Sequence, residues 1–143
     1  MDERFTPRPV AGWFMPGAIA SLLFMGLGCL ALALHVSADP AALPLDQRAL
    51  LEAEPHWVMA ASGLGFAAGL GGSLLLVLRR AAAVPLLLVS LIGFFVWVAG
   101  MFLSPRFRDL LSTNQIALVL VTVAIAWTIY WFARRSRQRG WLN

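Results

Sequence analysis

Residues 57–103 have the sequence WVMAASGLGFAAGLGGSLLLVLRRAAAVPLLLVSLIGFFVWVAGMFL, in which two apolar runs are separated only by Arg79 and Arg80. The runs, Trp57–Leu78 and Ala81–Leu103, contain no charged residue. A helix needs about 20 apolar residues to cross the hydrocarbon core of a bilayer, so each run is long enough to span a membrane. Because only two residues connect the runs, we expect a tight antiparallel hairpin of transmembrane helices.

Two further apolar runs flank this hairpin, Phe14–Val36 and Gln115–Ala133, and neither contains Asp, Glu, Lys or Arg. Of the 143 residues, 60% are hydrophobic and only 13% are charged. Soluble domains carry about 25% charged residues, and a disordered chain is far less apolar, so both classes are excluded. The sequence therefore predicts an all-α membrane protein, a single domain over residues 1–143 whose four transmembrane helices form an up-down antiparallel bundle.

A cleaved signal peptide is the alternative interpretation of the first run, because residues 36–38 (Val-Ser-Ala) resemble a small-residue cleavage site. The uncharged run from Trp13 to Leu34 has 22 residues. The apolar part of a signal peptide has only about 7–15 residues. We therefore expect the first run to remain as a transmembrane helix.

The distribution of arginine predicts the orientation of the spans. Eight arginines precede the first span, connect the second to the third, or follow the fourth: Arg4, Arg8, Arg79, Arg80, Arg134, Arg135, Arg137 and Arg139. The opposite side has three: Arg48, Arg106 and Arg108. By the positive-inside rule, residues 1–12 and 134–143 are cytoplasmic tails. The absence of Lys beside abundant Ala, Leu and Gly fits a GC-rich bacterial genome, so we expect a multi-pass protein of the bacterial inner membrane.

Aromatic residues and arginines near the span ends fit contact with lipid headgroups. The interface anchors are Trp13, Trp57, Tyr130, Trp131 and Trp141, since aromatic rings gather at membrane–water interfaces. Arg79, Arg80, Arg106, Arg108 and the four tail arginines are candidates for contact with anionic headgroups. Because these arginines lie between apolar runs, a lipid partner explains them better than nucleic acid, which we do not expect as a partner.

The first connection between spans, residues 37–56, is predicted to contain a short amphipathic helix. Leu45, Ala49, Leu50 and Ala53 recur at helical spacing, with charged residues on the other side, which is typical of a helix lying on a membrane surface. His35 and His56 border this connection and are weak candidates for a metal site. Their spacing to the loop carboxylates matches no known ligand pattern, so no metal or cofactor is predicted.

Small residues mark one face of the second span: Ala61, Gly65, Gly69 and Ser73 recur every four residues, with Gly72 beside them. Gly93 and Gly100 give the third span a similar face. In lipid, small side chains let helix backbones approach closely. The predicted helix-packing face fits contact within the chain, with a second copy, or with another membrane protein.

Several stretches resemble a family of small bacterial four-helix membrane proteins that are often labelled "sugar transporter" or hypothetical membrane protein. They are the run before Pro55-His56-Trp57, then residues 72–80 and 89–93, and the ending Trp131-Phe132-Ala133-Arg134-Arg135 with residues 139–142. The resemblance implies a transport role. Family members commonly have Trp-Asn in the first helix and Asp six residues after the Asn, where this chain has Phe24, Met25 and Ala31.

No acidic or basic residue lies inside a predicted span apart from the terminal His35, and no nucleophile–base pair is recognisable. Ion-coupled transporters usually keep ionisable groups at membrane depth. We therefore expect a non-enzymatic protein that acts through helix–helix contacts, as an accessory, structural or assembly subunit, its partners being the bilayer and another membrane protein or itself. The alternatives are a small oligomeric transporter and an outer-loop binder of a metal or ligand.

Overall fold

The computed structural model describes residues 9–143, and this part of the chain contains helices and no strand. Two of the arginines used to predict the orientation, Arg4 and Arg8, and most of the expected tail 1–12 lie outside the described residues. The helices are α1 (Phe14–Ser37), α2 (Leu45–Ala53), α3 (His56–Val77), α4 (Ala83–Leu103), α5 (Pro105–Leu110) and α6 (Thr113–Gln138), with a 3₁₀ turn, η1 (Pro40–Ala42).

Four of the six helices, α1, α3, α4 and α6, are long and apolar enough to cross a membrane. This confirms the prediction of an all-helical chain with four long apolar helices, which is compatible with a multi-pass membrane protein. Among the four spans, predicted and observed lengths differ most for α6. This helix continues to Gln138, so Arg134, Arg135 and Arg137, which were expected in a tail, are helical. A short helix is present in the first connection, as predicted, and is α2, whereas α5 was not predicted.

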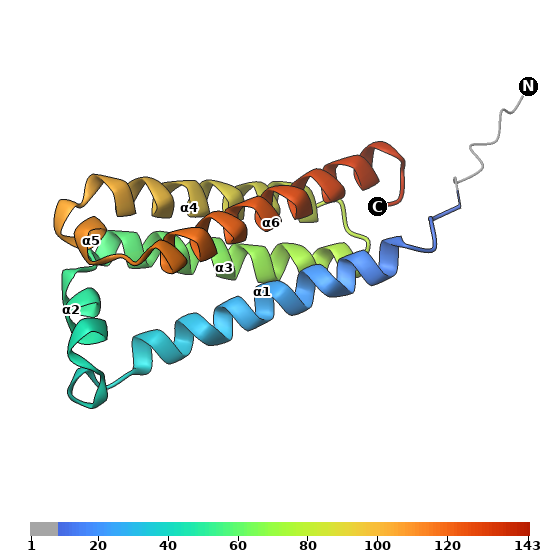
Figure 1. Cartoon of the computed structure of the whole chain (residues 1–143). Helices are drawn as coiled ribbons and strands as arrows, with labels where there is room; N and C mark the ends of the chain where they lie inside the picture. Colours follow the sequence, from blue (N-terminus) through green and yellow to red (C-terminus); the bar gives the residue numbers. More distant parts are fainter. Residues whose placement is uncertain (1–8) are drawn as a thin grey trace, which may run out of the picture.

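Figure 1 shows that α3 and α4 lie side by side and that α1 and α6 flank them. The start of α1 and the end of α6 lie at one end of the molecule, where Trp13 and Trp141 meet with ring centroids 5.6 Å apart. Helices α2 and α5 lie at the opposite end (Figure 1). From the first end to the second, α1 diverges from the other long helices, so α1 and α6 are separated near α2.

The turn between α3 and α4 begins at Arg79, whose φ of 56° lies in the left-handed region. The N–H of Arg80 donates to the carbonyl of Leu75 at 2.8 Å, and the N–H of Arg79 to that of Leu76 at 3.0 Å. These two bonds form a Schellman motif, in which glycine usually occupies the left-handed position. The last described residue returns to this turn: the N–H of Asn143 donates to the carbonyl of Arg79 at 2.7 Å.

The interface between α3 and α4 depends on residues without large side chains. A Cβ atom added to Gly93 would lie 2.9 Å from the backbone nitrogen of Gly65, so the two helix backbones touch at this point. The hydroxyl of Ser90 donates to the carbonyl of Gly65 at 2.6 Å, across the same contact. Small residues at a contact of this kind are typical of packing between membrane helices, where close backbone approach replaces the hydrophobic driving force.

Candidate functional site

A pocket of about 330 Å³ lies at the end of the bundle that carries α2 and α5, between the diverging helices α1 and α6. Residues of every helix line it. They are Gly28, Ala31, Leu32 and His35 of α1, Leu50 of α2 and Glu54 after it, Ser62 and Phe66 of α3, Trp97 and Met101 of α4, Phe107 of α5 and Leu111 after it, and Gln115, Leu118, Val119 and Thr122 of α6.

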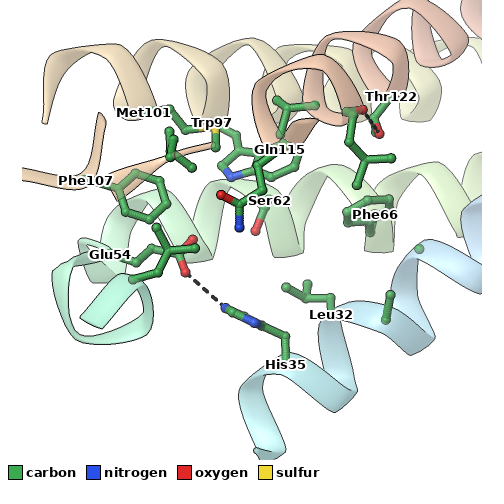
Figure 2. Close-up of a pocket in the computed structure, with 16 residues that line it drawn as sticks. Leu32, His35, Glu54, Ser62, Phe66, Trp97, Met101, Phe107, Gln115 and Thr122 are labelled. Carbon is green, nitrogen blue, oxygen red and sulfur yellow. Dashed lines mark hydrogen bonds and ion pairs between the residues drawn. The ribbon is translucent and has the colours of Figure 1, made fainter. Parts of the chain in front are cut away.

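We name this space the outer pocket, for the side on which the arginine distribution predicts it to open; its deeper part is apolar. Phe66 and Trp97 lie on its floor with ring centroids 6.4 Å apart, and Leu32 faces them from α1 (Figure 2). Gly28 is required here, because a Cβ atom at this position would clash with the ring of Phe66. Glycine therefore lets the aromatic ring lie between α1 and α3 and form the wall of the pocket.

The polar groups lie at the other side of the pocket, toward α2. His35 Nε2 and Glu54 Oε2 are 3.2 Å apart and connect the end of α1 to the segment after α2 (Figure 2). The Glu54 side chain is only 9% exposed, whereas that of His35 is 43% exposed. The pair therefore forms a half-buried polar rim where the pocket meets the surface.

Gln115 extends from the first turn of α6 into the same region (Figure 2). Its side-chain Oε1 accepts the N–H of Ser112 at 2.9 Å, and its own N–H donates to Ser112 Oγ at 3.3 Å, which forms a capping box. The amide nitrogen of the Gln115 side chain makes no hydrogen bond to any residue of the range 9–143. The capping box thus fixes a side chain that still has free donors beside the pocket.

The remaining hydroxyl groups of the pocket are satisfied by their own helices. Ser62 donates to the carbonyl of Met59 at 2.8 Å, and Thr122 to that of Leu118 at 2.9 Å. A hydroxyl that bonds its own helix backbone presents mainly carbon to its surroundings. Apart from the indole N–H of Trp97, the free polar groups of the pocket are therefore those of His35, Glu54 and Gln115.

The small residues named in the sequence lie inside the chain. A Cβ atom at Gly65 would meet Phe94, one at Gly69 would meet Met25 and Ser90, and one at Gly72 would meet Leu87. The same holds for Gly100, which lies against Val58 and Trp57, and both Ala61 and Ser73 are buried. Helices α1 and α4 cover this face, so any contact with another protein must use other residues.

The candidate interface residues divide between the two ends of the bundle. Trp57 is at the start of α3, and Arg106 and Arg108 are in α5, where Arg108 is 3.7 Å from Asp109. The start of α1, the turn between α3 and α4 and the end of α6 lie at the other end (Figure 1). These segments carry Trp13, Arg79, Arg80, Tyr130, Trp131, Trp141 and the arginines of α6. Trp141 is 7% exposed and packs on Phe14 rather than extending into a tail.

Neither histidine belongs to a cluster of ligands. His35 contacts Glu54, and His56 is exposed at the start of α3. Within residues 9–143, no three His, Cys, Asp or Glu side chains lie close enough to hold a metal ion.

Comparison with known proteins gives no relative: the chain matches no protein-family model, no curated protein and no solved structure. The resemblance to the "sugar transporter" family therefore remains an expectation. The function has to be argued from the residues that meet in the structure. Among them, Phe66, Trp97, Gln115 and Thr122 were not predicted as site residues, because only the divergence of α1 from α6 brings them around one space.

Proposed function

We propose that the protein is a non-enzymatic integral membrane protein that binds an amphiphile in the outer pocket. The observation that carries the proposal is the division of this pocket into an apolar floor and a polar rim. Small-molecule sites are typically apolar spaces of about 300–1,000 Å³ with a few polar groups that orient the ligand. The outer pocket, at about 330 Å³, fits this description.

The position of the pocket favours a ligand that is dissolved in the membrane. Its floor at Phe66 and Trp97 lies within spans α3 and α4, whereas its rim at His35 and Gln115 lies at the ends of spans α1 and α6. The rim is therefore at the depth of lipid headgroups and the floor is in the hydrocarbon. A molecule with one polar end and a short apolar body satisfies both regions.

The separation of α1 from α6 gives such a ligand a route from the bilayer. The buried residues of α1 are Phe14, Ala18, Ser21 and Met25, all in its first half. No residue after Met25 in this helix is buried, so the second half of α1 covers the pocket only loosely. An amphiphile can enter sideways between α1 and α6 without passing through water.

A filled pocket tests this proposal. Thr122→Phe places a ring at the lining of the pocket, whereas Val121→Phe, the matched control, adds the same ring to a neighbouring side chain that is 54% exposed and does not line the pocket. The protein is purified with its bound lipids and analysed by native mass spectrometry. We expect a specific adduct in the wild type and in Val121→Phe, and its loss in Thr122→Phe. Equal retention in both variants would contradict the proposal.

A second candidate function is that of an accessory, structural or assembly subunit in the bacterial inner membrane. It is favoured by the exposed stripe Leu23, Leu27, Leu30 and Leu34 on one face of α1. The last three lie after Met25, in the half of the helix that has no buried residue. Apolar residues at this spacing can contact a helix of another protein by close packing.

The accessory function is tested by mild detergent extraction, size separation and identification of co-migrating proteins. The double variant Leu27→Ala, Leu34→Ala should release a partner, since both side chains are 65% exposed and contribute little to the fold. Leu74→Ala, on an exposed site of α3, is the control. Migration of the wild type without any other protein would exclude this function and leave the amphiphile proposal intact.

A further inference from the structure

The end of the bundle opposite the outer pocket has two adjoining hollows, one between the start of α1 and the end of α6 and one on the end of α6 alone. One is a groove of about 270 Å³ that runs between Gly17 and Ser21 of α1 and Thr128 of α6. The other, of about 360 Å³, is lined by Trp131, Arg134, Arg135, Gln138 and Arg139. Trp131 and Arg135 line both, so the hollows adjoin at these two side chains.

The walls of the groove are apolar although three hydroxyl groups line it. Ser21 donates to the carbonyl of Gly17 at 2.8 Å, Thr128 to that of Ala124 at 2.9 Å, and Ser136 to that of Phe132 at 2.8 Å. Each hydroxyl is satisfied within its own helix and has no donor left for a ligand. The groove therefore suits a hydrocarbon chain.

The second hollow is strongly basic. The guanidinium of Arg135 lies 5.0 Å from the ring centroid of Trp131, and that of Arg139 lies 5.1 Å from that of Trp141. Stacking on an aromatic ring positions a guanidinium without using its N–H donors. Within residues 9–143, the side chains of Arg134, Arg135 and Arg139 form no ion pair and no hydrogen bond.

The charge of this end is not balanced by acidic side chains of the described chain. All five acidic residues in the range 9–143 lie at the opposite end. They are Asp39 before η1, Asp46 and Glu52 in α2, Glu54 after α2, and Asp109 in α5. The C-terminus of α6 contributes only about half a negative charge. Three guanidinium groups around one hollow exceed this and attract an anion.

We propose that the two hollows form one site for an anionic phospholipid of the adjacent leaflet. Its phosphate binds Arg134, Arg135 and Arg139 in the basic hollow, and one acyl chain lies in the groove between α1 and α6. Because the hollows adjoin at Trp131 and Arg135, one molecule with a phosphate and an acyl chain can occupy both, whereas a free ion would leave the groove unused. This inference does not rest on the function proposed for the outer pocket.

Two arginines on the same turn provide a matched test. Arg135 lines both hollows, whereas Arg137 is exposed and lines neither. Arg135→Gln and Arg137→Gln remove the same charge from the same helix end. Each variant is reconstituted in nanodiscs containing phosphatidylcholine and a minor fraction of phosphatidylglycerol, and the enrichment of phosphatidylglycerol on the released protein is measured by mass spectrometry.

We expect Arg135→Gln to lower this enrichment about fivefold more than Arg137→Gln, since one arginine near an anionic headgroup contributes about that factor. Equal losses in the two variants would overturn the proposal, because they would show that the arginines act only through the general charge of the surface.

The contact with the acyl chain is tested separately. Thr128→Phe, which fills the groove, should lower the enrichment, and Ala124→Phe, one turn away and outside the groove, should not.

A last experiment distinguishes binding of the whole phospholipid from binding of phosphate alone. Inorganic phosphate at millimolar concentration should compete poorly with phosphatidylglycerol for the wild type. Complete displacement by phosphate, or an unchanged enrichment in Thr128→Phe, would show that the hollow binds a bare anion and would overturn the assignment to a phospholipid.

Discussion

At the scale of single residues, the contact between α3 and α4 is limited by Gly93. An added Cβ atom would lie 2.9 Å from the backbone nitrogen of Gly65 and 3.1 Å from the carbonyl of Ala61. Backbone atoms cannot move aside as a flexible side chain can, so the helices must separate to accept even one methyl group. The same atom at Gly26 would meet only Leu70, at an ordinary 3.8 Å.

We therefore predict opposite effects of the same substitution at these two glycines. Gly93→Ala should destabilise the protein by roughly 1 kcal/mol, because overpacking costs about 1–3 kcal/mol and alanine returns about 1 kcal/mol of helix propensity. Gly26→Ala should leave stability unchanged or raise it. Unfolding by sodium dodecyl sulfate, followed by circular dichroism, measures both, and a stable Gly93→Ala variant would refute the contact.

Two buried serines give a second matched pair. Ser90 donates to the carbonyl of Gly65 at 2.6 Å, whereas the hydroxyl of Ser73 is fully buried and has no hydrogen-bond partner within residues 9–143. Hydrogen bonds between membrane helices contribute about 0.6 kcal/mol on average and at most about 2 kcal/mol. An unpaired buried hydroxyl instead costs free energy.

Ser90→Ala should accordingly lower the free energy of unfolding by about 0.5–2 kcal/mol. Ser73→Ala should leave it unchanged or raise it, because the substitution removes a polar group without a partner. The same denaturant titration checks both variants. A loss of stability in Ser73→Ala as large as that in Ser90→Ala would mean that Ser73 has a partner.

The residues of the helix contacts were recognisable in the sequence, but their partners were not. A small residue every four positions on α3 marks a face for close packing. The pattern does not say which helix covers it, because a second copy or another protein offers the same kind of surface. The pocket residues carry still less signal: Phe66, Trp97 and Thr122 are ordinary residues of an apolar span.

At the scale of elements, the end of α6 is held by the short segment that follows it. Trp141 packs edge-on against Phe14 at 5.9 Å, and the N–H of Ala81 donates to the carbonyl of Asn143. This segment joins α1, the turn between α3 and α4, and α6. It also holds Arg79 in its left-handed conformation through the hydrogen bond from Asn143.

Trp141→Ala should release this segment while the bundle stays folded. The amide of Ala81 should then exchange with deuterium at least about tenfold faster, since local opening exposes the N–H that Asn143 covers. Trp131→Ala, which removes an exposed ring from the same helix end, is the control. Hydrogen exchange measured by mass spectrometry checks both, and an unchanged Ala81 amide in Trp141→Ala would show that the ring does not hold the segment.

The long helices can be predicted from the sequence because a lipid environment requires helical structure of long apolar runs. Long uncharged runs must satisfy their backbone groups as helices, so four spans were predictable. The continuation of α6 to Gln138 was not predictable from hydropathy. The apolar run ends at Ala133, whereas the backbone stays helical through the polar residues that follow. Helix α5 is only six residues long, and its Pro-Arg-Phe-Arg-Asp-Leu sequence lacks a periodic pattern.

At the scale of the whole molecule, charge and shape assign different chemistry to the two ends of the bundle. The end with α2 and α5 holds every acidic residue of the range 9–143 and the outer pocket, whereas the other end holds the arginines of α6 and the turn. The positive-inside rule predicts that the second end is cytoplasmic. The proposed phospholipid site then lies in the cytoplasmic leaflet, and the outer pocket opens on the opposite face.

Single introduced cysteines test this orientation in intact bacterial cells. Cys29 is the chain's one cysteine, so Cys29→Ala provides a background without thiols. In that background, Asp109→Cys, on the exposed helix α5, should react with a membrane-impermeant maleimide added to intact cells. Gln138→Cys, at the exposed end of α6, should react only after lysis. The opposite labelling pattern would refute the orientation. It would move the arginine-lined hollow to the outer leaflet. The lipid enrichment expected in nanodiscs would not change, because nanodiscs expose both sides of the protein to the same lipids. The two tests therefore separate where the site lies from what it binds.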